Sequence, residues 1–275
     1  MNIIVTIKQV PESSNVKMDP ETGTMLRTSA EAVINPLDTN AIEAALTLRD
    51  KYGGKVTVIS MGPKRAVEAL YEALAMGCDE AVLLSSPKFA GSDTWATSYV
   101  LASAIKKLAP YDMVICGERA TDGETGQVGP GIAACLDLPL GTYISKFIEV
   151  DEDKARFERA VEGGHEILQT SLPFVAVVVK EIGTPRLSTV RSKLKAKKKE
   201  IPVWGADEIG AKPESIGLKG SPTKVVKINT PKLMRKGNLI TIKSPADIEK
   251  AADLFIDFLK ERELTEYITQ KERAS

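Results

Sequence analysis

The first half of the chain alternates short apolar runs with longer stretches in which apolar residues recur at helical spacing. The apolar runs, rich in Val, Ile and Leu, cover residues 3–7, 55–60, 81–84 and 113–116. The stretches with helical spacing cover residues 38–49, about 65–75, 94–108 and about 127–136. Short strands that single helices separate predict right-handed crossovers and a parallel sheet covered on both faces. We therefore expect a doubly wound α/β core.

The pattern changes towards the end of this core. Antiparallel segments are expected near residues 143–150, 156–161 and 166–170, followed by one more buried strand at 174–179. An extra polar stretch, residues 12–34, interrupts the first crossover, and residues 19–23 within it predict a hairpin turn. The core is expected to end near Gly183.

Residues 184–245 have scattered prolines and lysines and few long apolar stretches. Such a segment does not easily form a core of its own. A helical pattern then returns, with Ile248, Phe255 and Leu259 on one face. We expect residues 1–183 to form a nucleotide-binding core and residues 184–275 to form an arm that wraps around another protein, because so long a loop is unusual inside one domain.

Charge and composition exclude several classes of function. Lys and Arg together number 37, as do Asp and Glu, so no net field attracts nucleic acid or an anionic membrane. The three cysteines are far apart and His165 is the only histidine, which argues against a metal site or a histidine-based catalytic triad. No apolar run is long enough to span a bilayer, and the first residues lack the features of a signal peptide. The expectation is a cytoplasmic protein without membrane insertion.

Residues 121–131, Thr-Asp-Gly-Glu-Thr-Gly-Gln-Val-Gly-Pro-Gly, are the most informative stretch. They follow a predicted strand and lead into a predicted helix. Glycines allow close approach of the backbone, and free N–H groups at a helix start favour a phosphate. Asp122 and Glu124 would repel phosphate, so they should face ribose hydroxyls or solvent. A glycine-rich turn without a ligand is the alternative, and the stretch is neither a Walker loop nor a GxGxxG fingerprint.

Other strand ends should meet at the same crevice, since ligands in such sheets bind beyond the carboxyl ends of the strands. Thr6 and Lys8 end the first strand, Asp38 is a candidate N-cap of the first helix, and Met61 and Gly62 follow the second strand. Each of these residues alone is typical of a turn or a cap. Their common location predicts a binding site.

A cluster of lysines at 193, 195 and 197–199 marks the start of the arm. It is either a solvated helix face or a docking surface for an acidic partner. Nucleic acid is excluded as that partner, because the cluster has no interleaved aromatic residues.

Several segments in consistent order resemble the beta subunits of electron-transfer flavoproteins. They are Ile-Lys-Gln-Val-Pro at 7–11, Asn35-Pro36, Ser-Met-Gly-Pro at 60–63, Ala-Met-Gly at 75–77 followed by Asp79, the loop 117–129, Pro185-Arg186 and Lys-Ala-Lys-Lys-Lys at 195–199. The resemblance covers nearly the whole chain. It implies a Rossmann-like fold of the adenine nucleotide alpha hydrolase-like (HUP) type.

The resemblance also implies which residues form the cofactor pocket. Carried over position by position, and with Lys8 and Gly62 added from their strand ends, the candidates are Thr6, Lys8, Asn35, Pro36, Leu37, Asp38, Met61, Gly62, Gly117, Glu118, Arg119, Ala120, Thr121, Asp122, Gly123, Glu124, Thr125, Gly126, Gln127 and Val128. A flavin ring in this pocket would lie near Thr6, Lys8 and Asp38, towards the alpha subunit. No side chain is expected to perform acid–base catalysis, and the protein is interpreted as an electron carrier.

Residues 185–199 are similar to the recognition loop with which the family docks onto partner dehydrogenases. Val190 stands where an apolar anchor is expected. Arg191 follows it where many members have proline, so the partner can differ. The predicted docking residues are Val190, Arg191, Lys193 and Lys195.

The family has two functional branches. In one, the beta subunit holds a structural AMP, and the FAD is held largely by the alpha subunit. In the other, the beta subunit holds a second FAD, which takes hydride from NADH and sends single electrons to the alpha-subunit FAD and to a low-potential iron–sulfur or flavin carrier. The partners that the resemblance implies are the alpha subunit and a dehydrogenase or iron–sulfur and quinone-reducing subunits. This sequence is more similar to the second, bifurcating branch, on residues 122–125, 127–130, 200–203, 220–223 and 230–232.

Two rival interpretations come from other classes. A universal-stress-type nucleotide sensor uses a glycine motif whose start matches Gly126-Gln-Val-Gly129, but the next Gly-Thr pair, at 141–142, comes too late. A PP-loop ATP-dependent ligase would carry a Ser-Gly-Gly-x-Asp-Ser signature after the first strand, and this chain does not.

Overall fold

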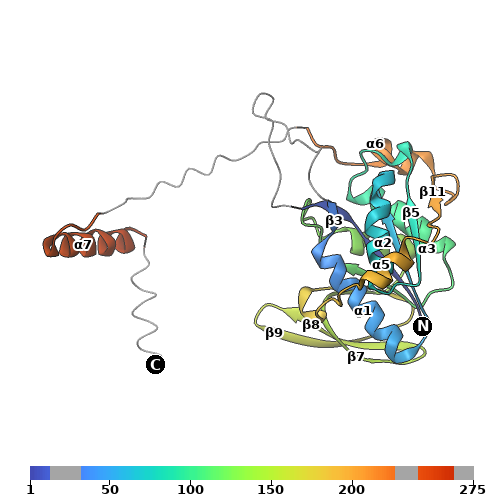
Figure 1. The fold of residues 1–275 in the computed structure, drawn as a ribbon, viewed down its shortest axis with the longest axis horizontal. Helices are drawn as coiled ribbons and strands as arrows, with labels where there is room; N and C mark the ends of the chain where they lie inside the picture. Colours follow the sequence, from blue (N-terminus) through green and yellow to red (C-terminus); the bar gives the residue numbers. More distant parts are fainter. Residues whose placement is uncertain (13–31, 227–240, 263–275) are drawn as a thin grey trace. The chain divides into compact units, whose positions relative to one another are not determined.

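The computed structural model describes residues 1–12, 32–226 and 241–262 (Figure 1). The chain divides into two units, Met1–Val225 and Val226–Ser275. The hairpin turn predicted at residues 19–23 lies outside the described residues.

The first unit is built on a nine-stranded sheet with the order β11-β5-β4-β1-β6-β10-β7-β8-β9. In chain order its strands are β1 (Asn2–Ile7), β4 (Lys55–Met61), β5 (Glu80–Leu84), β6 (Met113–Gly117), β7 (Leu140–Val150), β8 (Lys154–Val161), β9 (Gly164–Ser171), β10 (Phe174–Val178) and β11 (Val203–Trp204). All neighbours from β11 to β7 are parallel, whereas β8 and β9 are added antiparallel. A separate antiparallel pair joins β2 (Gln9–Pro11) and β3 (Ala32–Ile34). The predicted doubly wound, mainly parallel α/β fold is confirmed.

Helices cover both faces of this sheet, which is why the central strands are apolar along nearly their whole length. The elements are α1 (Pro36–Tyr52), η2 (Lys64–Ala66), α2 (Val67–Met76), η3 (Pro87–Phe89), α3 (Thr94–Lys107), α4 (Val128–Leu136), η4 (Lys180–Ile182), α5 (Val190–Ala196), η5 (Pro213–Ser215) and α6 (Gly217–Gly220). One hydrophobic core lies under α1 and α2, and the other lies under α3 and α4.

The prediction that Asp38 is the N-cap of the first helix is wrong. The helix begins at Pro36, with Asn35 as its N-cap residue. Proline suits the first helical position because its fixed φ matches the helix and its missing N–H has no helical partner there. Asp38 therefore lies inside the first turn, where its Oδ2 accepts a hydrogen bond from the Lys8 N–H at 2.7 Å.

The compact unit continues beyond the expected end of the core at Gly183. Strand β11 extends the sheet beside β5, with Val203 opposite Leu83. Ala196 and Ile201 are buried in one hydrophobic core, and Ile209 and Ile216 are buried in the other. A proline-rich segment with few apolar residues cannot build a core, but its isolated apolar side chains can still cover an existing one. Residues up to Val225 thus belong to the first unit.

The second unit contains helix α7 (Pro245–Glu261), where a helix was predicted. Ser244 and Asp247 form a capping box at its start, with the Ser244 N–H 2.8 Å from Asp247 Oδ2. Within its own unit the apolar side chains of this helix, among them Leu254 and Phe255, are exposed. In the described ranges, no helix has the length and apolar character needed to cross a membrane.

Candidate functional site

The direction of winding reverses at β1. The chain passes from β1 to β4 and β5 on one side, and α3 then carries it back to β6 on the other side of β1. Crossovers that leave in opposite directions open a crevice beyond the carboxyl ends of the two central strands. Thr6 lies opposite Cys116 at this end, so the residues predicted from the first strand and from the glycine-rich loop do come together.

Asn35 joins three segments of the crevice. It is completely buried, and its backbone N–H donates to Lys8 O at 2.8 Å. Its side chain donates from Nδ2 to Arg119 O at 2.8 Å and accepts at Oδ1 from the Thr121 N–H at 3.1 Å. The side-chain amide is therefore used within the protein. Its contribution to the site is to hold the loop after β6 against the end of β1.

Asp38 lies buried beside this junction, in close contact with the end of β6. A Cβ added at Gly117 would fall 2.4 Å from Asp38 Oδ1, so only glycine allows this approach. Burial raises the pKa of Asp38 to about 7, although hydrogen bonds from the Asn35 side chain and the Lys8 N–H act in the opposite direction. The crevice thus contains a carboxyl group that holds its proton under mildly acidic conditions.

An ion pair links the two sides of the crevice. Lys8 Nζ lies 2.6 Å from Asp122 Oδ1, and both side chains are partly exposed. Asp122 therefore faces a cation of the protein, and Glu124, two residues later in the loop, is exposed. The expectation that these two carboxylates turn away from a bound phosphate is compatible with this arrangement.

The loop between β6 and α4 offers backbone donors. The N–H groups of Gly123 and Glu124 turn back to Ala120 O, at 3.2 and 2.8 Å. Among the described residues, no acceptor is found for the N–H groups of Thr125, Gly126 and Gln127. Glu124 and Gly126 have φ values of 50° and 63°, in the left-handed region, just before the N-terminus of α4. Such a cluster of free donors favours a phosphate.

Strand β4 provides a residue that the sequence analysis missed. Ser60 is fully buried near the carboxyl end of β4, and its Oγ has no hydrogen-bond partner in the described part of the chain. Buried hydroxyls are normally paired, so an unpaired one near a crevice suits a polar ligand atom or a water molecule. A serine that interrupts an apolar strand just before Met61 and Gly62 was the available signal.

The remaining predicted residues of this strand end lie nearby. Met61 and Gly62 are partly buried, and the Gly62 N–H donates to Leu84 O at 3.0 Å. Thr6 is buried opposite Cys116 on the neighbouring strand. Burial raises the pKa of the Cys116 thiol to about 12, which keeps it protonated and unreactive.

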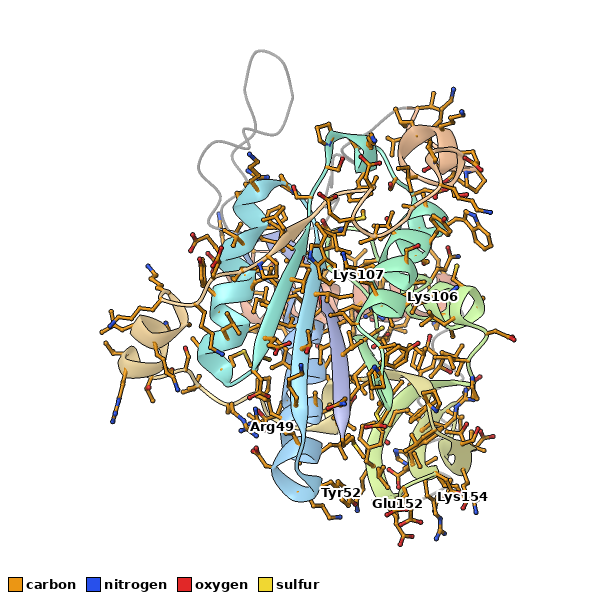
Figure 2. All side chains as sticks on the ribbon, turned by 90° about the vertical axis from the view of Figure 1, so that its right-hand side faces the viewer. Arg49, Tyr52, Lys106, Lys107, Glu152 and Lys154 are labelled. Carbon is orange, nitrogen blue, oxygen red and sulfur yellow. The ribbon has the colours of Figure 1, made fainter. Side chains whose placement is uncertain are left out.

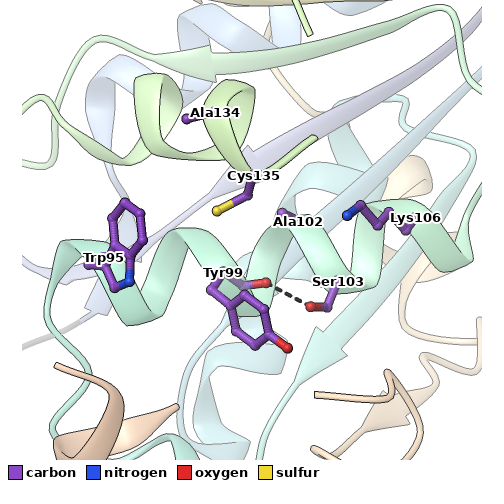
Figure 3. A pocket seen from close by; sticks show the side chains of 7 residues that line it. All are labelled: Trp95, Tyr99, Ala102, Ser103, Lys106, Ala134 and Cys135. Carbon is purple, nitrogen blue, oxygen red and sulfur yellow. Dashed lines mark hydrogen bonds between the residues drawn. The ribbon is translucent and has the colours of Figure 1, made fainter. Parts of the chain in front are cut away.

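Two cavities lie away from the crevice. One, of about 310 Å³ between α3 and α4, is lined by Trp95, Tyr99, Ala102, Ser103, Lys106, Ala134 and Cys135 (Figure 3). The other, of about 390 Å³, is formed by residues that include Tyr52 and Glu152, which Figure 2 shows at the end of α1 and beside it. Neither cavity is lined by residues from the carboxyl ends of β1 and β6, the switch point at which the winding reverses, or by residues of the 118–127 loop. The crevice is therefore the better candidate for a nucleotide.

The predicted docking residues lie on and around helix α5. Val190, Arg191, Lys193 and Lys195 are all exposed. The sequence analysis missed two further apolar side chains on this surface, Leu187 and Leu194, which are 94% and 62% exposed; Val190 is 77% exposed. The spacing of four residues between Val190 and Leu194 was the signal that could have found Leu194, because it places two side chains on one face of α5, whereas Leu187 lies before that helix.

Comparison with known proteins identifies the family of this chain. The profile of the electron transfer flavoprotein domain matches residues 22–209. The electron transfer flavoprotein subunit beta of Thermoanaerobacterium thermosaccharolyticum is 46% identical over 263 residues, which cover 95% of this chain and 99% of the relative. The chain belongs to the electron transfer flavoprotein family.

Other members of the family are similar over most of their length. The caffeyl-CoA reductase–Etf complex subunit CarD of Acetobacterium woodii is 42% identical over 96% of this chain and all of the relative. Protein FixA of Azotobacter vinelandii is 44% identical over 84% of this chain and 85% of the relative. The chain therefore corresponds to the beta subunit of an electron transfer flavoprotein, as the sequence resemblance implied.

Proposed function

We propose that the crevice at the β1–β6 switch point holds FAD and that the chain works with an alpha subunit in flavin-based electron bifurcation. The observation that supports this most directly is the group of backbone donors at Thr125–Gln127, which have no acceptor in the described part of the chain, on a loop that Asn35 holds in place. When bound, the flavin would take hydride from NADH and release electrons singly, to the alpha-subunit FAD and to a low-potential acceptor.

The residues of the crevice fit such a ligand. The donors of the 125–127 loop and the start of α4 would bind the pyrophosphate, and Lys8 would add a positive charge at the mouth of the crevice. Ser60 Oγ is free to pair with a polar atom of the ligand. Asp38, which keeps its proton up to about pH 7, would add no negative charge near the phosphates below that pH.

AMP is the alternative occupant. Its adenosine and phosphate present the same groups to the loop as the corresponding half of FAD. We favour FAD because the sequence is more similar to the bifurcating branch, on residues 122–125, 127–130, 200–203, 220–223 and 230–232.

The proposed partners are an alpha subunit and a protein that accepts or donates electrons. The exposed apolar side chains of α7 would pack against the alpha subunit, because a helix with such a face needs a partner. The docking segment, defined as residues 186–199, would bind the electron-transfer partner. The name of the Acetobacterium relative suggests an acyl-CoA reductase for that role.

Nucleotide analysis of the purified heterodimer tests the proposal. The complex is denatured, and the released nucleotides are separated and quantified against protein. Two FAD molecules per heterodimer are expected. One FAD and one AMP would place the protein in the non-bifurcating branch, and a heterodimer with no nucleotide beyond that of the alpha subunit would overturn the assignment of the crevice.

A further inference from the structure

The docking segment is exposed at its centre and fixed at its two ends. Leu187, Val190 and Leu194 point into solvent, whereas Ala196 is buried against the core beneath α2. At the far end, Lys199 Nζ donates a hydrogen bond to Asp79 O. The segment is therefore anchored to the body of the sheet, and its apolar side chains are presented from a fixed base.

Arg186 forms the anchor at the near end, with four hydrogen bonds to α1. Its backbone N–H and its Nε each lie 2.9 Å from Glu43 Oε2, and its Nη2 lies 2.9 Å from Glu43 Oε1. Its Nη1 donates to Asp50 Oδ2, also at 2.9 Å. The planar guanidinium matches two carboxylate oxygens at once, a geometry that a lysine cannot reproduce.

The charges of this contact support a tight interaction. Burial alone would raise the pKa of Glu43, but its hydrogen bonds with Arg186 outweigh burial, and the net shift of that pKa is downward. The side chain of Glu43 is only 13% exposed, so the pair is shielded from solvent on one side. Ion pairs of this partly buried, bidentate kind contribute more than exposed ones.

The chain that leads into the docking segment is held by the same helix. Asn40 Nδ2 donates to Gly183 O at 2.8 Å and to Lys180 O at 3.3 Å. Asn40, Glu43 and Asp50 thus form one row along α1 that bonds to residues 180–186. This row fixes where the docking segment begins.

We propose that Arg186 is a positioning residue for partner docking: its contacts with Glu43 and Asp50 preset the ridge of Leu187, Val190 and Leu194. The inference rests on the docking role proposed above and adds how the surface is organised before the partner arrives. A preset surface loses less conformational entropy on binding, which lowers the cost of association. The partner that fits is a protein with an apolar pocket and acidic surroundings, because Arg191, Lys193, Lys195, Lys197 and Lys198 around the ridge are all exposed cations.

The test uses the intact heterodimer with the substitution Arg186→Lys. This variant keeps the positive charge but cannot form the bidentate contact of the guanidinium with Glu43. Any effect therefore reports the geometry of the contact rather than net charge. Arg156→Lys, at an exposed arginine of strand β8, is the matched control. Hydrogen–deuterium exchange of residues 187–196 measures how firmly the segment is held. The KM and kcat for a purified acyl-CoA reductase measure docking, and reduction of a small one-electron dye measures electron transfer without docking.

For Arg186→Lys we expect exchange in the segment to become about tenfold faster, because part of the local contact energy is lost. The KM for the reductase should rise about fivefold with kcat unchanged, and dye reduction should keep its rate. The control should change none of these. Unchanged exchange, or faster exchange with an unchanged KM, overturns the positioning role.

A second variant separates this inference from the docking role itself. Val190→Ser with Leu194→Ser removes the two ridge side chains that lie on α5 but leaves Arg186 and its partners intact. If this double variant and the wild type share the same KM for the reductase, the docking role is wrong, whatever Arg186 does. If the double variant raises the KM and Arg186→Lys does not, docking stands and the positioning role fails.

Discussion

The crevice and the docking segment are built on opposite principles. In the crevice, buried polar groups such as Asn35 and Asp38 hold the backbone in place, and their hydrogen bonds are made within the chain. In the docking segment, apolar side chains such as Val190 are exposed, and polar contacts such as the one between Arg186 and Glu43 hold the start of the segment on α1. Damage to the crevice should therefore reduce stability and nucleotide content together, whereas damage to the ridge should affect association alone.

The largest effect is expected for Asn35→Ala. The substitution removes the bonds to Arg119 O and the Thr121 N–H and leaves two backbone groups without partners. Both bonds are partly buried, and a group that loses its partner there costs about 1–2 kcal/mol, so the unfolding free energy should fall by about 2–4 kcal/mol. Urea denaturation and nucleotide content of the complex measure this. Asn2→Ala, whose side chain makes one exposed contact, is the control. A variant that keeps full stability and nucleotide would show that Asn35 does not hold the loop.

Gly117→Ala should come next. The added Cβ would lie 2.4 Å from Asp38 Oδ1 and 2.8 Å from the backbone of Leu37, so the start of α1 has to move. Forcing extra volume into a packed site costs about 1–3 kcal/mol. Thermal or urea unfolding checks the loss, with Gly164→Ala as the control because no atom lies within 4 Å of its added Cβ. Equal stability of the two variants would contradict the close approach.

Asp38→Asn tests the buried carboxyl by its pH dependence. The folded state keeps the proton up to about pH 7, while the unfolded chain loses it near its ordinary value of 3.8. Wild-type stability is therefore fully present below that value and falls as the pH rises towards 7. The variant lacks this loss, so its unfolding free energy relative to the wild type should rise between pH 4 and 7 and level off above. A difference that does not vary with pH would mean that Asp38 ionises normally.

The smallest effect on stability is expected for Lys8→Gln. Its ion pair with Asp122 is partly exposed, and such pairs contribute about 0–1 kcal/mol. Nucleotide binding should suffer more than folding, because the variant removes a cation from the mouth of the crevice. Titration of the nucleotide-free heterodimer with FAD at low and high salt measures this, and the difference between wild type and variant should shrink at high salt. If the loss of affinity is the same at low and high salt, Lys8 does not attract the nucleotide by its charge.

Much of the fold could be predicted from local pattern. The strands β1, β4, β5, β6 and β10 are short apolar runs, and the helices between them have regular apolar spacing, so both kinds of element were found with small errors at their ends. The start of α1 was misplaced although the Asn35-Pro36 pair is a recognisable beginning of a helix. The sequence analysis took the acidic side chain of Asp38 as the N-cap, whereas in the structure the helix begins at Pro36.

Contacts between distant parts of the chain could not be predicted. The bonds between Arg186 and Glu43 join residues 143 positions apart, and nothing in the spacing of either residue indicates the other. The same holds for the unpaired hydroxyl of Ser60 and for the burial of residues 184–225, which depends on a core that already exists. The rule for parallel sheets predicted that the ends of the strands meet, but the internal use of the Asn35 side chain required coordinates.

Helix α1 also fixes the spacing between the crevice and the base of the docking segment. Asp38 near its first turn faces the crevice, and Asn40, Glu43 and Asp50 farther along it bond to the base of the docking segment. Each residue of an α-helix turns the chain by about 100°, so a single deletion between Asp38 and Glu43 would swing one set of side chains away from its target. The hairpin between β8 and β9, by contrast, tolerates changes in length because it is an exposed turn. Natural variation in length should therefore avoid the first turns of α1 and collect in such hairpins.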